Sequence, residues 1–218
     1  MKRILNEVES YQLFHKYGID VIEYKMCTNL KEALEQAKDI GYPVVAKVIS
    51  KEILHKTDAG CVYIGAKEPV ELEKAWNMIM SNAFKNYPNA KVEGILIQKM
   101  AKNGLELIVG VKRDLQFGPI ILFGLGGIYT EIFDDVSIRL LPICFEDAEE
   151  MIKETKIYKM LSGARGKCYD VNSIITALQG VSKMIEENND IIEVDVNPLF
   201  VFREGVMAAD GLIIIEEK

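Results

Sequence analysis

The sequence predicts an α+β fold, and three features of its apolar pattern support this prediction. The run 42–49 is apolar apart from Lys47, which is typical of a buried strand. Apolar residues recur at helical spacing over 30–40 and 69–84. Near the C-terminus, short strand-like runs follow one another with only brief turns between them. This mixture of hairpins and helices indicates an α+β architecture.

The expected elements begin with two helices and a strand. Residues 4–17 carry apolar side chains near one stripe, and Gly18 ends this helix. Asn29 can cap a helix over 30–40, directly before the strand 42–49. The elements expected after these are strand 61–66, helix 69–84, strands 92–100 and 106–111 with a turn at Asn103-Gly104 between them, strands 119–123 and 138–141, helices 147–160 and 172–187, and strands 191–196, 199–203 and 206–208.

Length, charge and cysteine content narrow the class of protein. The 218 residues suffice for one large domain or two smaller subdomains with a real core. The formal net charge of -7 argues against nucleic acid or an anionic membrane as the main partner. Four widely spaced cysteines without a Cys-x-x-Cys pair suggest neither a zinc site nor a disulfide framework. Because a signal core and a membrane-length apolar stretch are both lacking, we expect a cytoplasmic protein.

A cation lies inside the expected strand 42–49, and an imidazole follows that strand after a few residues. Lys47 lies inside the apolar run 42–49, where a cation needs a partner such as a phosphate. His55 follows in a polar stretch, and neutral imidazole is a nucleophile that can be phosphorylated near pH 7. Together they suggest phosphoryl transfer. Plainer interpretations stay open: Lys47 could snorkel to solvent or pair with a carboxylate, and His55 could be a solvated or capping residue.

Oxygen-bearing side chains gather near the C-terminus. Strand alternation places Glu193, Asp195 and Asn197 on one face, and Asp210 follows across an expected hairpin. Magnesium prefers oxygen ligands and bridges nucleotide phosphates with only one or two protein carboxylates. Neighbouring carboxylates without a cation repel one another, which favours a metal site. The alternative is a solvated face of an edge strand.

Two weaker patterns could contact a nucleotide. The run Gly124-Leu125-Gly126-Gly127 could bring backbone amides close to an anion, although glycine-rich turns are common without ligands. Gln98, Lys99 and Met100 end a strand, where the backbone could contact an adenine edge. Glu106 is placed to accept a hydrogen bond from a ribose hydroxyl.

The order of these motifs resembles a known family over about residues 4–215. The motifs are Tyr17-Gly18-Ile19, Gly41-Tyr42-Pro43-Val44-Val45-Ala46-Lys47-Val48, His55-Lys56-Thr57-Asp58-Ala59-Gly60, Gly124-Leu125-Gly126-Gly127 and Glu193-Val194-Asp195-Val196-Asn197-Pro198. They resemble the ATP-grasp β subunit of ADP-forming acyl-CoA synthetases such as acetyl-CoA synthetase, relatives of succinyl-CoA synthetase. The resemblance implies one ATP-grasp domain over 1–218, with the nucleotide held between α+β subdomains at about 25–100 and 101–218.

The resemblance also implies a reaction and a set of site residues. In that family, phosphate breaks the acyl-CoA thioester, the phosphoryl group passes to a histidine of the partner subunit, and a β-subunit histidine carries it to ADP. The implied cofactors are ATP or ADP and Mg²⁺. The implied roles are His55 as the carrier, Lys47 at the α and β phosphates, Gln98, Lys99 and Met100 at the adenine, Glu106 at the ribose, and Asn197 and Asp210, with Asp195 beside them, at the metal.

A partner subunit is implied as well. The chain contains neither a CoA-binding Rossmann domain nor a second histidine motif, so a CoA-binding α subunit with the first phosphohistidine would complete a hetero-oligomer. One departure is Gly60-Cys61, where the family usually has two glycines that permit close backbone approach. Two other functions remain open, a stand-alone ATP-grasp carboxylate ligase and a non-catalytic nucleotide-sensing subunit. Neither of these needs His55.

Overall fold

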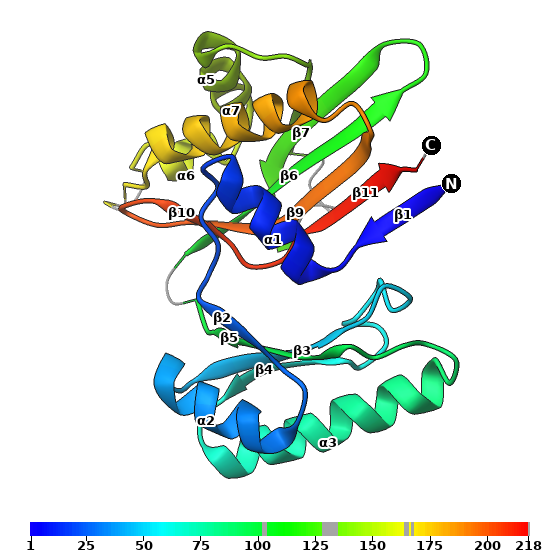
Figure 1. Ribbon diagram of the computed structural model, residues 1–218. Coiled ribbons are helices and arrows are strands. Elements are labelled where there is room, and N and C mark those ends of the chain that lie inside the picture. The colour runs from blue at the N-terminus through cyan, green and yellow to red at the C-terminus, as the bar shows by residue number, and fades with distance from the viewer. Residues whose placement is uncertain (102–103, 128–134, 164–165, 167, 218) are drawn as a thin grey trace. The chain divides into compact units, whose positions relative to one another are not determined.

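The computed structural model describes residues 1–101, 104–127, 135–163, 166 and 168–217 (Figure 1). The chain forms two compact units, and the second interrupts the first along the sequence. The small unit comprises Ile22–Lys102, and the large unit comprises Met1–Val21 together with Asn103–Lys218. Each unit has a sheet of its own.

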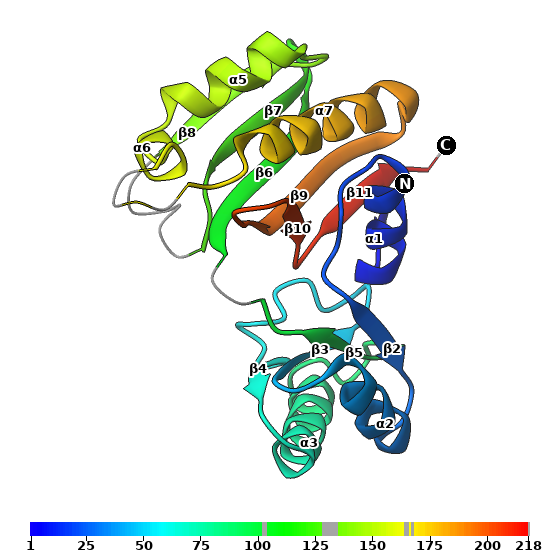
Figure 2. The ribbon, with the colours of Figure 1, turned by 90° about the vertical axis from the view of Figure 1, so that its left-hand side faces the viewer.

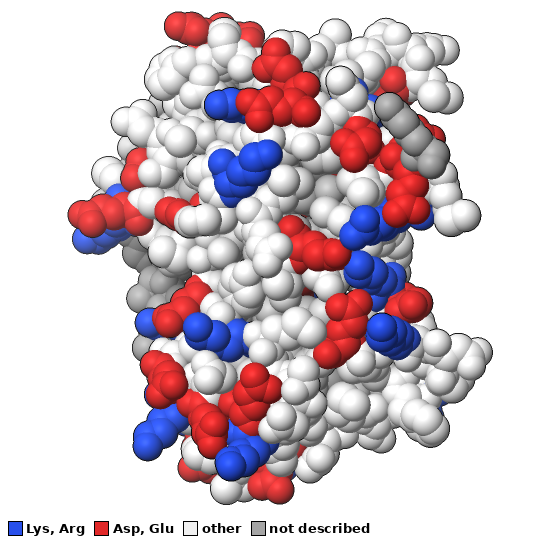
Figure 3. Space-filling model, in the orientation of Figure 1, with Lys and Arg blue, Asp and Glu red and all other residues white. Residues whose placement is uncertain are grey.

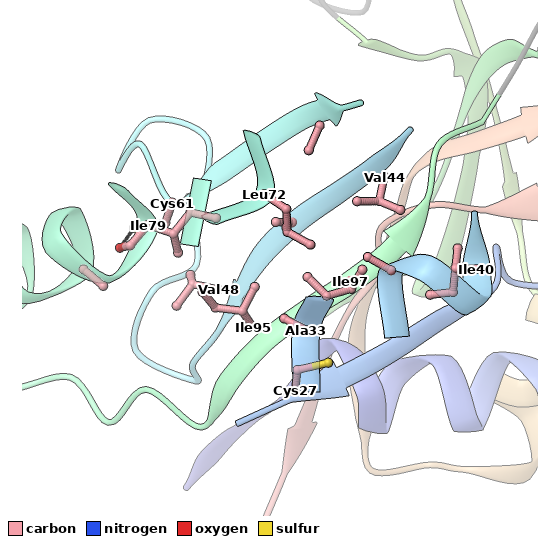
Figure 4. Packing of buried hydrophobic residues seen from close by; sticks show 14 of the residues in the cluster. Cys27, Ala33, Ile40, Val44, Val48, Cys61, Leu72, Ile79, Ile95 and Ile97 are labelled. Atoms are coloured by element: carbon pink, nitrogen blue, oxygen red, sulfur yellow. Dashed lines mark hydrogen bonds between the residues drawn. The ribbon is translucent and has the colours of Figure 1, made fainter. Parts of the chain in front are cut away.

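The small unit is an antiparallel four-stranded sheet with two helices on one face (Figure 1). The strands lie in the order β2 (Tyr24–Cys27), β5 (Gly94–Lys99), β3 (Val44–Ile49) and β4 (Val62–Ala66). The helices are α2 (Leu30–Ile40) and α3 (Pro69–Asn86). Asn29 caps α2 by accepting a hydrogen bond from the Glu32 N–H at 3.0 Å. The core between helices and sheet, drawn in Figure 4, includes Ala33, Ile40, Val44, Val48, Leu72, Ile79, Ile95 and Ile97.

The large unit is built on a seven-stranded sheet. Its strand order is β1 (Lys2–Leu5), β11 (Leu212–Glu216), β9 (Ile191–Val201), β6 (Leu105–Asp114), β7 (Gly118–Leu125) and β8 (Val136–Leu140), with β10 (Val206–Ala208) paired to β9. The helices are α1 (Glu7–Lys16), α5 (Phe145–Glu154), α6 (Tyr158–Leu161) and α7 (Val171–Glu187). Helix α7 packs against β9 and β10, and α5 packs against β7 and β8 (Figure 2).

The two ends of the chain lie side by side in the large unit. Strand β1 pairs with β11 in antiparallel register, from Lys2 opposite Glu216 to Leu5 opposite Ile213. The amino group of Met1 donates a hydrogen bond to the Glu217 carbonyl at 2.7 Å. The N-terminal strand is therefore an integral part of this sheet.

The α+β architecture expected from the sequence is confirmed, and several elements have the expected bounds. Helix α2 and strand β10 match their expected ranges, and α3 begins at Pro69 as expected. Residues 4 and 5, expected at the start of the helix 4–17, belong instead to β1. Helix α1 begins only after Asn6, whose side chain accepts from the Glu9 N–H at 2.9 Å while the Glu9 carboxylate accepts from the Asn6 N–H at 2.7 Å.

Other expectations about the elements are wrong. Strands β2 and β11 lie outside the expected set, and 191–196 and 199–203 belong to one strand, β9, up to Val201. The expected helix 147–160 divides into α5 and α6. Strands β5 and β6, between which a turn is expected, belong to different sheets. Asn103 of the expected turn between them lies outside the described residues.

The surface of the molecule carries charges of both signs. On the face drawn in Figure 3, acidic and basic side chains are interspersed among uncharged residues. This distribution accompanies a formal net charge of -7. In the described ranges, no helix combines the length and the apolar character that crossing a membrane requires.

Candidate functional site

Lys47 and Gln98 lie on the same face of the small unit's sheet. Ala46 and Val48 enter the core beneath the helices, so Lys47 between them points to the opposite face. Val45 pairs with Gln98, and Val45 is two residues from Lys47, so the Gln98 side chain shares that face. Lys47 is 6% exposed and Gln98 is 2% exposed. The structure thus brings a buried cation and a buried amide together on the sheet face opposite to α2 and α3.

Lys99 and Met100 continue from Gln98 at the end of β5. The Lys99 side chain is exposed, and its Nζ lies 3.7 Å from a carboxylate oxygen of Glu23. The Lys99 N–H donates to the Glu23 carbonyl at 2.9 Å, and the Met100 N–H donates to the Pro43 carbonyl at 3.3 Å. Both N–H groups are thus bound within the protein. An adenine at this strand end would either bind to backbone carbonyl groups or displace the longer hydrogen bond, the one from the Met100 N–H.

His55 lies on the loop that joins β3 to β4, and its side chain is exposed. Ile53 on one side of it and Ala59 on the other are both buried. The Ala59 N–H donates to the His55 carbonyl at 3.0 Å, which folds the stretch between them back on itself. An exposed imidazole is therefore carried on a short arc between two buried residues.

Cys61 stands where the family described above usually has the second of two glycines, and it is fully buried. Its Sγ lies 3.5 Å from the Ala59 carbonyl oxygen and 3.9 Å from that of Ile79. Burial raises the pKa of the Cys61 thiol. The cysteine side chain points into the core of the small unit, so it does not occupy the outer side of the loop.

Three carboxylates come together in the large unit. Glu193 and Asp195 lie on the face of β9 opposite to the buried Val194. Leu212 of β11 pairs with Asp195, which brings Asp210, two residues earlier in the chain, close to it. Burial, the Asp210 carboxylate and the Glu193 carboxylate raise the pKa of Asp195 from 3.8 to about 6. The cluster carries excess negative charge, which a bound cation would neutralise.

Asn197 extends this row of oxygen ligands. It follows Asp195 by two residues on β9, where the pairing with β6 shifts register. Within the described part of the chain, no group of three or more His, Cys, Asp or Glu side chains is placed to hold a metal ion. A site here would instead use Asp195, Asp210 and the Asn197 amide oxygen, a donor set suited to Mg²⁺ with water as its other ligands.

Glu106 lies on β6, on the same face of the large sheet as Asp195. Gly110 pairs with Asp195, and Glu106 precedes Gly110 by four residues on the same strand. The glycine-rich run packs against this part of β6. The Gly126 N–H donates to the Glu106 carbonyl at 2.9 Å, and a Cβ on Gly127 would meet the Glu106 carboxylate. The Gly126 N–H is therefore bound within the protein, and the glycine-rich run packs against both the backbone and the carboxylate of Glu106.

The sequence gives no sign of one contact that holds the segment containing Asp210. Tyr11 of α1 is fully buried, and its hydroxyl donates to the Ala209 carbonyl at 2.6 Å. The same hydroxyl contacts the buried carboxyl group of Glu7. Because 198 residues separate Tyr11 from Ala209, no local pattern could have revealed this contact.

Known proteins match this chain over almost its whole length. The ATP-grasp domain family matches residues 1–215. The β subunit of ADP-forming acetate–CoA ligase II from Pyrococcus furiosus is 46% identical over 214 residues, which are 96% of this chain and 91% of that one. ADP-forming acetate–CoA ligase I from Archaeoglobus fulgidus is 44% identical over 211 residues, which are 96% of this chain but 31% of that protein.

Solved structures of acetyl-CoA synthetase 1 from Ca. Korarchaeum cryptofilum have the same fold. One, in complex with coenzyme A and Ca-AMPCP, superposes with a TM-score of 0.93 at 41% identity, over 98% of this chain and 94% of that one. Another holds coenzyme A and Mg-AMPPCP, with its phosphohistidine segment pointing towards the nucleotide-binding site, and has a TM-score of 0.84 at 39% identity, over 98% and 93% of the two chains. The family and fold expected from the sequence are thereby confirmed, and this chain belongs to the ATP-grasp family, among the β subunits of ADP-forming acetate–CoA ligases.

Proposed function

We propose that this chain is the nucleotide-binding β subunit of an ADP-forming acyl-CoA synthetase, which converts acyl-CoA, ADP and phosphate into a carboxylic acid, ATP and CoA. The observation that carries the proposal is the exposed His55 on the loop after the Lys47 strand. The Korarchaeum relative has a phosphohistidine segment that points towards its nucleotide-binding site. A stand-alone ligase or a nucleotide sensor has no use for an imidazole on this loop.

Each unit, taken by itself, carries residues suited to one part of the nucleotide. Lys47 would donate to the α and β phosphates, since charge-assisted hydrogen bonds from a buried ammonium are strong. The strand end at Gln98, Lys99 and Met100 would contact the adenine, with backbone carbonyls accepting from its amino group. Glu106, supported by Gly127, would accept from a ribose hydroxyl.

The metal site would be formed by Asp195, Asn197 and Asp210. Burial and, after it, the nearby Asp210 and Glu193 carboxylates raise the pKa of Asp195, and a divalent cation would offset the charge of this cluster. When bound, Mg²⁺ neutralises charge on the phosphates of the nucleotide. The protein's contribution is to hold the three oxygen donors on β9 and directly before β11.

His55 would carry the phosphoryl group. When ATP is the donor, an unprotonated ring nitrogen of His55 attacks the γ phosphorus. The nitrogen–phosphorus bond forms as the bond between that phosphorus and the β–γ bridging oxygen breaks, and ADP leaves. When ATP is made, the same bonds form and break in the reverse direction.

A separate α subunit would complete the enzyme. The Pyrococcus furiosus relative is named as a β subunit, and the matched region is 31% of the longer Archaeoglobus fulgidus relative. We assign the CoA site and the first phosphohistidine to the α subunit, so that this chain turns over only in a hetero-oligomer. Cys144 and Cys168 are exposed free thiols, which supports the reducing cytoplasm as the location.

The proposal is tested by comparing His55→Ala with His15→Ala in the complex reconstituted with the α subunit. His15 is an exposed histidine on α1 and serves as the matched control. We expect His55→Ala to bind nucleotide and still accumulate acyl phosphate or phosphorylated α subunit from acyl-CoA and phosphate. It should form no ATP, because only the carrier step is removed.

The measurements are ATP formation and acid-labile phosphate on each subunit. ATP formation by His55→Ala at nearly the wild-type rate would refute the carrier role and favour a ligase that needs no phosphohistidine. Nucleotide binding without any turnover in the wild-type complex would favour a nucleotide sensor. His15→Ala should match the wild type in both measurements.

A further inference from the structure

The C-terminal end of the β3–β4 loop is attached to helix α3 by side chains. We call residues 59–61 the loop root. Nδ2 of Asn82 donates to the Gly60 carbonyl at 2.7 Å, and Nδ2 of Asn86 donates to the Ala59 carbonyl at 3.2 Å. Because Asn82 and Asn86 are four residues apart, they lie on the same side of α3, one above the other. Two successive carbonyls of the root are thus bound to one helix.

Cys61 attaches the root to the core. Its buried side chain lies beside Ile79 of α3 in Figure 4, with Sγ 3.9 Å from the Ile79 carbonyl oxygen. The Cys61 carbonyl accepts from the Val48 N–H at 3.0 Å, so the root is bound to β3 as well. The cysteine that departs from the usual double glycine therefore contributes an anchor on the inner side of the loop.

Gly60 fits closely against the Asn82 amide. It has a φ of +65°, and a Cβ at this position would lie only 2.7 Å from Asn82 Nδ2. Glycine adopts this conformation without steric cost and leaves room for the amide. A larger side chain at position 60 would therefore displace the Asn82 amide from this contact.

The root is also connected directly to the arc that carries His55. The Ala59 N–H donates to the His55 carbonyl at 3.0 Å, and the Cys61 N–H donates to the Lys56 carbonyl at 2.8 Å. A displacement of the root would change the position of His55, because these bonds join the two within a few residues.

We propose that Asn82 is a positioning residue for phosphoryl transfer by His55, an inference that rests on the proposed function above. By holding the root on α3, Asn82 confines the arc that carries the imidazole to the residues between Ile53 and Ala59. A nucleophile held on a short arc has a higher effective concentration at the phosphorus than one on a longer, free loop. Asn82 itself does not contact the transferred group.

The test compares Asn82→Ala with Asn77→Ala, which replaces an exposed asparagine on the same helix. Calorimetry on the full chain gives the affinity for Mg-ATP, and acid-labile phosphate formed from ATP gives the rate of His55 phosphorylation. We expect Asn82→Ala to bind Mg-ATP within about twofold of the wild type but to phosphorylate His55 roughly tenfold more slowly, the change expected for one lost hydrogen bond. Asn77→Ala should match the wild type in both.

A spectroscopic measurement separates positioning from general stability. The chain has two histidines, so imidazole NMR signals report on His55 with the exposed His15 as an internal reference. Asn82→Ala should shift or broaden only the His55 signals. If Asn82→Ala does not fold, Asn86→Ala, which removes the longer bond, must show the same separation of affinity from rate with a smaller change in rate.

Three results would overturn the inference. A phosphorylation rate of the Asn82 variant at or above that of the wild type would leave the proposed function standing but remove the positioning role. A parallel loss of affinity and rate would indicate a structural role for Asn82. If wild-type His55 takes up no acid-labile phosphate from ATP or from a phosphorylated α subunit, the proposed function itself fails.

Discussion

Lys47 is a cation on an otherwise apolar strand and is 6% exposed. We predict that Lys47→Met, which keeps an unbranched side chain but removes the charge, lowers the affinity for Mg-ADP by roughly 10- to 100-fold, because strong charge-assisted hydrogen bonds to phosphate are lost. Calorimetry measures the effect. The control is Lys74→Met, which replaces an exposed lysine on α3 and should change the affinity by less than about twofold. Equal affinity changes in the two variants would remove Lys47 from the phosphate site.

Asp195 connects the charge of the proposed metal site to the stability of the protein. Its pKa is raised from 3.8 to about 6, so the folded state holds the proton more tightly than the unfolded state does. Between about pH 4 and pH 6 the unfolded chain ionises first, so the free energy of unfolding falls as the pH rises through this window. Below pH 4 both states are protonated, and the contribution of this group vanishes.

We therefore predict that Asp195→Asn stabilises the metal-free protein at pH 7 by about 1–3 kcal/mol relative to the wild type, since one pKa unit is worth about 1.4 kcal/mol. At pH 4 the difference between the two proteins should be close to zero. Urea unfolding in the presence of a chelator at both pH values measures it. If the difference in the free energy of unfolding were the same at both pH values, ionisation of Asp195 would not be its cause.

Among the elements, those with local signals are predictable from the sequence. Asn29 before α2 and Pro69 at the start of α3 fix the beginnings of these helices by capping and by backbone geometry. The pair Asn6 and Glu9 is a capping box of the same kind, and it marks the start of α1 correctly where apolar spacing alone does not.

Elements whose pairing partners are distant in sequence are less predictable. Strands β1 and β11 pair across almost the whole chain. In β9, Pro198 suggests a break, yet the strand continues because the pairing with β6 shifts register at this point, where a residue without an N–H is tolerated. For the same reason, the types of the site residues can be predicted, whereas the proximity of Asp195 and Asp210 depends on the pairing of β9 with β11.

Helix α1 provides a test at the scale of an element, because Tyr11 binds the segment before β11. We predict that Tyr11→Phe lowers the free energy of unfolding by about 1–3 kcal/mol, since a buried hydrogen bond to the Ala209 carbonyl is lost. Urea unfolding measures this change. Tyr63→Phe, at a half-buried tyrosine of the small unit, is the control and should cost less. Equal costs would mean that the Tyr11 contact contributes little.

At the scale of the whole molecule, the large unit is assembled from both ends of the chain. The small unit, Ile22–Lys102, is inserted between Val21 and Asn103. Dividing the sequence into contiguous segments does not assign residues 1–21 to the large unit. Their pairing partners lie near the C-terminus, far away in the sequence. The Ala208 N–H, for example, donates to the Asp20 carbonyl at 2.8 Å. A fold in which the chain leaves a unit and returns to it is specified by such long-range contacts.

The pairing of β1 with β11 has a consequence for protein fusions. Because the amino group of Met1 contacts the Glu217 carbonyl, a polypeptide joined before residue 1 and one joined after residue 217 would emerge at the same end of the neighbouring strands β1 and β11. A linker of a few residues would be enough to join the two ends into a closed ring. The order in which this module and a second module are fused in one gene would therefore have little influence on where the second module starts in space.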